Sequence, residues 1–261
     1  MKAVILCGGK GMRLHEETEF KPKPLINIGD RPILWHIMKT YAHYGVRDFI
    51  LCLGYKGQMI KDYFLNFDEH HNDFTLTLGS GEKKISYHTK KAADNWNITF
   101  VDTGANTNTG GRIARIKSFL GEDKEFFLTY GDGVADINID KLYKFHKKSG
   151  RSITLSGVQP LMPFGIIEPA GGVVKSFEEK PKNKKGVING GFYVCDRRVF
   201  NYLTPDERCV FESDSLPAIA KKGQLAVYSH RGFWHCMDTH KHMEDLNVMY
   251  QIGDRPWAIW E

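Results

Sequence analysis

Near its N-terminus the chain contains the stretch Lys2-Ala3-Val4-Ile5-Leu6-Cys7-Gly8-Gly9-Lys10-Gly11-Met12-Arg13-Leu14. The short apolar run predicts a buried strand, and the glycines that follow predict a tight turn. Glycine lets backbone N–H groups approach phosphate oxygens closely, and the forked Arg13 guanidinium suits a polyphosphate. The stretch therefore predicts a phosphate-binding loop at the end of a buried strand.

Two common nucleotide-binding loops do not fit this stretch. A dinucleotide-binding Rossmann loop has the pattern G-x-G-x-x-G, and Leu14 stands where the third glycine belongs. The second predicted strand, residues 49–53, is not followed by the carboxylate that would bind the ribose. The chain also lacks the G-x-x-x-x-G-K-[ST] motif of P-loop ATPases. The sequence thus argues against both classes.

Strands and helices alternate along the rest of the chain. Apolar runs predict strands at residues 49–53, 126–130, 153–158, 191–195 and 225–228, and helical spacing predicts helices at 34–41, 58–67, 140–148, 216–221 and 240–250. Such alternation is typical of an α/β fold with a parallel central sheet flanked by helices. Polar alternation within residues 73–101 predicts a small antiparallel excursion from that sheet.

Composition narrows the class of protein. Of 261 residues, 41% are hydrophobic and 26% are charged, which is typical of globular proteins, and no apolar run approaches the roughly 20 residues of a membrane span. Five scattered cysteines without a C-x-x-C pair, and no signal peptide, predict a reduced cytoplasmic protein. The net charge is only +5 and is spread along the chain, which favours a small anionic substrate over nucleic acid.

Further motifs extend the pattern beyond the loop. They are Lys21-Pro22-Lys23-Pro24, Thr109-Gly110-Gly111-Arg112, Tyr130-Gly131-Asp132-Gly133, Glu178-Glu179-Lys180-Pro181, Asn189-Gly190-Gly191 and Met237-Asp238-Thr239. With the glycine-rich loop, this ordered set resembles the sugar-1-phosphate nucleotidyltransferase family, and in particular its glucose-1-phosphate cytidylyltransferase branch. The resemblance covers almost the whole chain. It implies a Rossmann-like, GT-A-like single domain over 1–261, with a nucleotide-binding half (1–135) and a sugar-phosphate-binding half (136–261).

The resemblance also implies a reaction. CTP and glucose 1-phosphate would give CDP-glucose and pyrophosphate, for CDP-deoxysugar and surface-polysaccharide synthesis. The nucleophile is a phosphate oxygen that is already ionised, so the site needs cations and alignment rather than a general base. The expected partners are these two substrates, with no nucleic acid and no membrane. The family resemblance further implies a homo-oligomer, such as a hexamer or a smaller multiple, with residues 83–116 as an insertion that contacts a neighbouring subunit.

Site residues follow from the same resemblance. Arg13, Lys23 and Asp132 are expected to be catalytic, and Asp132 and Asp238 are expected to hold one Mg²⁺ ion, for which carboxylate oxygens are suitable ligands. The expected nucleotide-binding residues are Leu6, Gly8, Gly9, Gly11, Met12, Arg13, Lys23, Thr109, Gly110, Gly111 and Asp132. The expected sugar-phosphate-binding residues are Arg112, Glu179, Lys180, Asn189 and Gly190.

Some positions depart from the pattern of the branch. Met12 replaces a threonine or serine of the loop, and further departures occur at Pro163, Asp214, Ser215, His235 and Cys236. Most of them fall on the acceptor side, so they weaken the assignment of glucose 1-phosphate more than that of cytidylyl transfer. A different phosphorylated acceptor or nucleotide is therefore one alternative, and a non-catalytic CDP-sugar-binding protein is another.

Overall fold

A seven-stranded sheet forms the centre of the computed structural model, which describes residues 1–79, 81, 84–89, 94–159, 166–170, 173–178 and 186–261. Its strands, in spatial order, are β14 (Leu225–Ser229), β10 (Ile153–Val158), β13 (Ile188–Asp196), β8 (Glu125–Tyr130), β1 (Ala3–Leu6), β4 (Asp48–Leu53) and β7 (Asn97–Asp102). Four of the neighbouring pairs are parallel, and only β13 runs antiparallel to its neighbours. The predicted α/β fold with a mostly parallel central sheet is confirmed.

The direction of β13 is the main difference from a fully parallel sheet. The described part of the connection from β10 contains a hairpin, β11 (Ile166–Ala170) and β12 (Val173–Glu178), and no helix. A parallel return requires a crossover, usually a helix on a face of the sheet. Without such a crossover, β13 enters antiparallel to β10.

Helices cover both faces of the sheet, as the apolar β1 requires. Ala3 and Ile5 pack into one hydrophobic core, which includes α2 (Ile33–His43), and Val4 and Leu6 pack into the other, which includes α5 (Thr109–Arg115). The remaining helices are α1 (His15–Thr18), α3 (Gly57–Leu65), α4 (Phe67–His71), α6 (Ile139–Ser149), α7 (Leu216–Lys221) and α8 (His240–Gln251), with shorter turns at η1 (Met12–Leu14), η2 (Lys23–Leu25), η3 (Lys117–Leu120), η4 (Arg197–Tyr202) and η5 (Phe211–Ser215). Alternate side chains of one strand thus anchor two separate layers.

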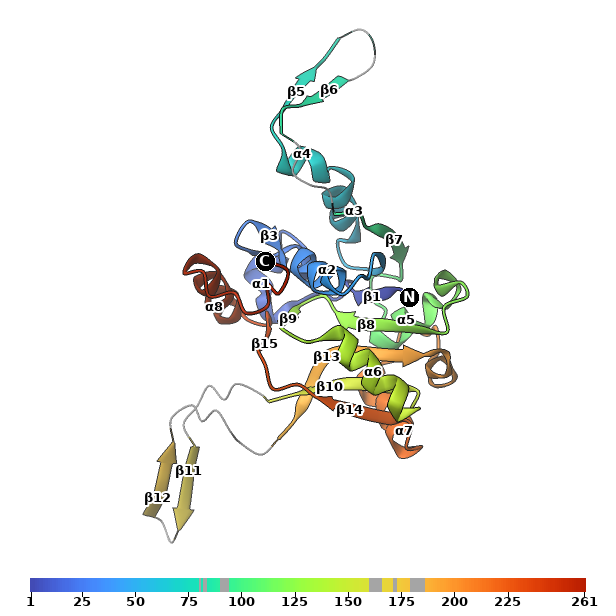
Figure 1. Ribbon diagram of the computed structural model, residues 1–261, viewed down its shortest axis with the longest axis vertical. Helices are drawn as coiled ribbons and strands as arrows, with labels where there is room; N and C mark the ends of the chain where they lie inside the picture. The colour runs from blue at the N-terminus through green and yellow to red at the C-terminus, as the bar shows by residue number, and fades with distance from the viewer. Residues whose placement is uncertain (80, 82–83, 90–93, 160–165, 171–172, 179–185) are drawn as a thin grey trace.

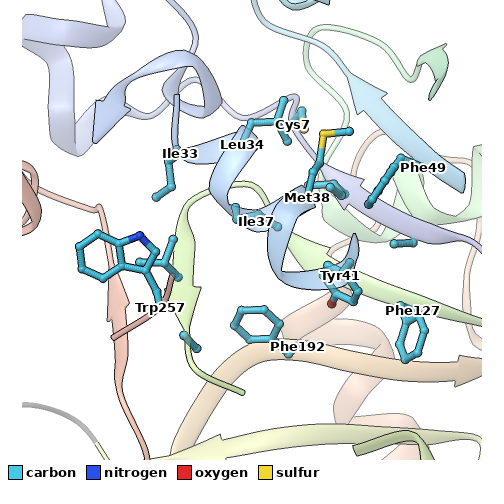
Figure 2. Close-up of a cluster of buried hydrophobic side chains, with 14 of the residues drawn as sticks. Cys7, Ile33, Leu34, Ile37, Met38, Tyr41, Phe49, Phe127, Phe192 and Trp257 are labelled. Atoms are coloured by element: carbon cyan, nitrogen blue, oxygen red, sulfur yellow. The ribbon is translucent and has the colours of Figure 1, made fainter. Parts of the chain in front are cut away.

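Helix α2 fixes the segment that precedes it against the sheet. Figure 2 shows Met38 and Tyr41 of this helix among the rings of Phe49, Phe127 and Phe192. The ring of Tyr41 lies 5.5 Å from that of Phe127 and 6.3 Å from that of Phe192. Large rings packed in this way stabilise a core beyond their buried area. The Lys-Pro-Lys-Pro segment is therefore followed in the chain by a helix, α2, that is firmly packed in the core.

Small antiparallel elements stand outside the main sheet. The hairpin of β5 (Phe74–Thr77) and β6 (Lys84–Tyr87) and that of β11 and β12 extend from the body at opposite ends in Figure 1. Two shorter pairs join β2 (Asn27–Ile28) to β3 (Arg31–Pro32) and β9 (Gly133–Ala135) to β15 (Trp234–Cys236). The predicted excursion is confirmed for β5 and β6. The predicted insertion over residues 83–116 is wrong, because it contains strand β7 of the main sheet.

Because His36 of α2 is buried in the core, we expect the stability of the fold to depend on pH in the acidic range. Its side chain is 2% exposed; Nε2–H donates to the carbonyl of Ile28 at 3.0 Å, and Nδ1 accepts from Trp257 Nε1 at 3.3 Å. Burial lowers the pKa of His36 to about 4, below its usual 6.5. The unfolded chain therefore binds more protons between pH 4 and 6.5, so stability falls as the pH is lowered through this window.

The loss expected from His36 is about 3 kcal/mol, at about 1.4 kcal/mol per pKa unit. Urea unfolding at several pH values measures it. His36→Gln retains one donor and one acceptor but does not titrate, so its free energy of unfolding should change less over the same window. An equally steep loss in the variant would show that other groups cause the effect.

No helix in the described ranges combines the length and the apolar character that a membrane span requires.

Candidate active site

The site lies at the carboxyl ends of two adjacent parallel strands, β1 and β8. The glycine-rich turn follows β1, and Gly131 and Asp132 follow β8, where the Gly131 N–H donates to the carbonyl of Leu6 at 3.1 Å. A cavity of about 430 Å³ opens at this edge. Crevices at the carboxyl ends of strands are the usual ligand sites of open α/β sheets.

Nine of the predicted nucleotide-binding residues line this cavity: Leu6, Gly8, Gly9, Gly11, Met12, Arg13, Lys23, Thr109 and Asp132. Gly110 and Gly111 pack behind Thr109 in α5, where the Gly111 N–H donates to the carbonyl of Cys209 at 3.1 Å. Met12 is 76% exposed, so the side chain that replaces the usual hydroxyl points largely to solvent. The structure thus gathers residues from distant parts of the sequence around one hollow.

Two glycines of the turn are required by geometry. Gly11 has φ +63°, a left-handed conformation that favours glycine, and a Cβ there would lie 2.7 Å from Thr18 Cγ2. A Cβ on Gly8 would lie 2.1 Å from Nη1 of Arg112. The backbone at Gly8 therefore rests directly on the guanidinium group.

Arg112 lines the first cavity and not the second, where the predicted sugar-side residues Asn189 and Gly190 lie. Only 4% of it is exposed, and its Nη groups donate to the carbonyls of Gly8, Leu53 and Gly104 and to the Thr103 hydroxyl at 2.8–2.9 Å. The family resemblance predicted that it binds the sugar phosphate. Because these donors are bonded within the chain, Arg112 supports the glycine-rich turn through its contact with the carbonyl of Gly8.

Lys23 joins the two predicted metal-binding carboxylates. Its Nζ lies 2.6 Å from Asp132 Oδ2 and 2.6 Å from Asp238 Oδ1, and Arg13 Nη1 lies 3.1 Å from Asp238 Oδ2. The Met237 N–H donates to the carbonyl of Asp132 at 2.8 Å, which ties the end of β15 to that of β8. Two segments about a hundred residues apart thereby present their carboxylates to one ammonium group.

These contacts govern ionisation in the site. Burial alone would lower the pKa of Lys23, but Asp132 and Asp238 outweigh it and raise that pKa above its usual value. Burial would likewise raise the pKa of Asp238, but Lys23 and Arg13 hold it below its usual range. Lys23 and Asp238 are therefore both charged at neutral pH.

The donor set fits a Mg²⁺ ion that also takes ligands from substrate. In the ranges that the structure describes, no group of three or more His, Cys, Asp and Glu side chains converges as a metal site. Asp132 and Asp238 nevertheless converge on one cation, the Lys23 ammonium. Mg²⁺ is commonly bound by one or two carboxylates, with phosphate and water oxygens completing its shell. Two carboxylates at the edge of the first cavity match that pattern.

A second cavity, of about 420 Å³, shares Arg13, Tyr130, Asp132 and Asp238 with the first. The predicted sugar-side residues Asn189 and Gly190 line it, and Trp234 Nε1 donates to the carbonyl of Gly190 at 2.8 Å. Glu179, Lys180 and Pro163 lie outside the described residues. The two cavities therefore meet at the charged cluster around Lys23.

The acceptor-side departures have different positions. Cys236 lines the second cavity with its Sγ 3.7 Å from Asp238 Oδ2, and burial raises the pKa of its thiol to about 11. His235 is half-buried, with its Nδ1 2.9 Å from the carbonyl oxygen of Cys236. Neither Asp214 nor Ser215 is among the described residues that line the cavities. Of these four positions, Cys236 alone places a neutral side chain beside the carboxylates.

Sequence reasoning missed several polar residues of the site, among them Tyr130, Tyr193 and Glu212. Tyr130 lines both cavities, Glu212 lines the second, and Tyr193 contacts the Tyr130 hydroxyl at 2.9 Å. Tyr130 directly precedes Gly131-Asp132, so its position in that motif was the available signal. Glu212 lies 80 residues beyond Asp132, and the available signal was its position next to the departures at Asp214 and Ser215.

Comparison with known proteins agrees with this geometry. Residues 2–252 match the family model described as nucleotidyl transferase. The chain is 46% identical over 260 residues to a probable glucose-1-phosphate cytidylyltransferase of Bacillus subtilis and 44% identical over 261 residues to the glucose-1-phosphate cytidylyltransferase of Salmonella typhimurium, with 100% of both chains covered in each case. A crystal structure of HddC from Yersinia pseudotuberculosis matches with a TM-score of 0.68 and 22% identity, covering 95% of this chain and 99% of that one. This last likeness concerns the fold.

Proposed function

The chain belongs to the nucleotidyl transferase family, and from this membership we propose that it transfers a cytidylyl group from CTP to α-D-glucose 1-phosphate. Two cytidylyltransferases at 44–46% identity over their whole length support this choice of substrates. The observation that carries it in the structure is the meeting of two cavities at Arg13, Asp132 and Asp238. A triphosphate in one cavity and a sugar phosphate in the other would bring their reacting phosphates to the same cations.

The reaction is an in-line displacement at the α-phosphorus of CTP. An acceptor phosphate oxygen forms the new bond to phosphorus, and the bond to the bridging oxygen breaks as pyrophosphate leaves with the electron pair. Both reactants are anions, so the main task of the protein is to offset their repulsion and align them. Lys23 is placed to bind the α-phosphate, and Arg13 to bind the β- and γ-phosphates.

Asp132 and Asp238 would hold Mg²⁺, which when bound supplies charge that stabilises the phosphate oxygens. In the structure, the Lys23 ammonium group forms ion pairs with both carboxylates. It therefore has to turn from them toward the α-phosphate as substrate enters. Backbone N–H groups of the glycine-rich turn, supported by Arg112, would contact the remaining phosphate oxygens.

Pyrophosphate release tests the proposal. Purified protein is incubated with Mg²⁺, glucose 1-phosphate and each of the four NTPs in turn. Release with CTP alone is the expected result. Release with another NTP would show that CTP is not the specific donor. Release only with another sugar phosphate would show that the acceptor is not glucose 1-phosphate. Tight binding of CDP-glucose without turnover would favour a binding protein instead.

We also propose a homo-oligomer, such as a hexamer, in the cytoplasm. The hairpin of β5 and β6 extends from the body with all four residues of β5 exposed, and an isolated two-stranded hairpin is marginally stable in water. A monomer at micromolar concentration in sedimentation velocity would refute the oligomer.

The cysteines support the proposed cytoplasmic location. All five lie in the described part of the chain and are free, as in reducing compartments.

A further inference from the structure

Glu212, in η5, connects residues of the two cavities through its carboxylate. The Thr109 hydroxyl donates to Oε2 of Glu212 at 2.6 Å, and the Tyr130 hydroxyl donates to Oε1. Thr109 lines the first cavity, and Tyr130 lines both. One carboxylate thus holds a side chain from the start of α5 and another from the end of β8.

The hydrogen bonds continue from Tyr130 into the second cavity. The Tyr130 and Tyr193 hydroxyl oxygens lie 2.9 Å apart, and Asn189 Nδ2 donates to the Tyr193 hydroxyl. Asn189 Oδ1 accepts from the Gly191 N–H at 2.9 Å, which sets the direction of the amide. Asn189 retains one N–H that no contact within this network uses. The network therefore runs from the nucleotide-side cavity to the sugar-side cavity.

The direction of each proton in the network follows from its two ends. A tyrosine hydroxyl is both a donor and an acceptor, so Tyr130 and Tyr193 each have one proton to place. Tyr130 donates its proton to Glu212, so the proton in the contact between the two hydroxyls comes from Tyr193. Thr109 accepts from the Phe211 N–H at 2.9 Å and donates to Glu212. Both branches end on the one group that only accepts.

We propose that Glu212 is a positioning residue that fixes side chains of both cavities, Thr109 in the first and Asn189 in the second. The inference rests on the proposed function, because that function assigns CTP to the first cavity and glucose 1-phosphate to the second. Through Thr109, Glu212 holds the start of α5. Through Tyr130 and Tyr193, it orients the Asn189 amide so that one N–H faces the acceptor.

A glutamine at this position weakens both branches. Its uncharged amide keeps one acceptor oxygen and turns a donor nitrogen toward the other hydroxyl, so one branch loses its hydrogen bond and the other loses the charge assistance of the carboxylate. Either loss costs about 1 kcal/mol, which is about fivefold in affinity. Tyr193→Phe breaks only the branch to Asn189, and Thr109→Val breaks only the branch to α5.

Calorimetric titration of the whole protein with Mg²⁺ present measures the dissociation constants of CTP and of glucose 1-phosphate separately. We expect Glu212→Gln to weaken both by about fivefold. Tyr193→Phe should weaken glucose 1-phosphate alone, and Thr109→Val should weaken CTP alone. The double variant Thr109→Val/Glu212→Gln should bind CTP no more weakly than Thr109→Val does, because both changes break the same branch.

Asp214→Asn is the matched control. It removes a carboxylate from the same segment but keeps an acceptor for the Val210 N–H, which now bonds Asp214 Oδ2 at 2.7 Å, so both dissociation constants should stay unchanged. A Glu212→Gln variant that only melts at a lower temperature, with both affinities intact, would overturn the assignment. Wild-type protein that bound neither ligand would refute the proposed function itself.

Discussion

Lys23→Ala should lower kcat for pyrophosphate release by a factor of 100 or more. The Lys23 side chain is only 11% exposed and lies 2.6 Å from both Asp132 and Asp238, so its charge acts in a partly dehydrated site. Removing one preorganised charge stabiliser costs about 3 kcal/mol of transition-state stabilisation. If Lys23 stabilises the α-phosphate mainly in the transition state, kcat should fall much more than the affinity for CTP.

Lys21→Ala is the matched control for this change. Lys21 belongs to the same Lys-Pro-Lys-Pro segment, but it does not line either cavity among the described residues. Because Lys21 lines neither cavity, its removal should leave kcat within about twofold. A Lys23→Ala enzyme that kept more than a tenth of the wild-type rate would contradict the proposed role of Lys23.

The order of elements could be predicted because local pattern and burial agree. Residues 2–7, 49–53 and 126–130 are almost wholly apolar, and the structure buries the corresponding strands between two layers of helices. The direction of β13 could not be predicted, because an apolar strand has the same pattern in either direction. The role of β7 was missed for a similar reason. It lies at the edge of the sheet, so five of its six residues are only half-buried or exposed, and its pattern resembles that of a hairpin.

The site was predictable where a residue type has one common use. Glycines before Arg13 and the isolated aspartates Asp132 and Asp238 indicated phosphate and metal chemistry, and the structure brings them to one cavity. Arg112 was misplaced because an arginine in a glycine-rich motif has the same sequence whether it reaches a ligand or supports a backbone. Only the fold shows that carbonyl oxygens of Gly8, Leu53 and Gly104 surround it.

Asp132→Asn should abolish Mg²⁺-dependent turnover and leave the fold intact. The carbonyl of residue 132 accepts from Met237 in either case, and an asparagine oxygen can still accept from Lys23, so the melting temperature should change little. The amide lacks the charge that a divalent cation needs, and a loss of several kcal/mol in transition-state stabilisation lowers kcat by about 1,000-fold. A Mg²⁺ titration of the initial rate, alongside thermal unfolding, measures both quantities.

Asp140→Asn serves as the control. Asp140 is an exposed carboxylate in the first turn of α6, so this variant should retain the wild-type Mg²⁺ dependence. Because the prediction separates activity from folding, an unfolded Asp132→Asn protein would contradict it just as full activity would.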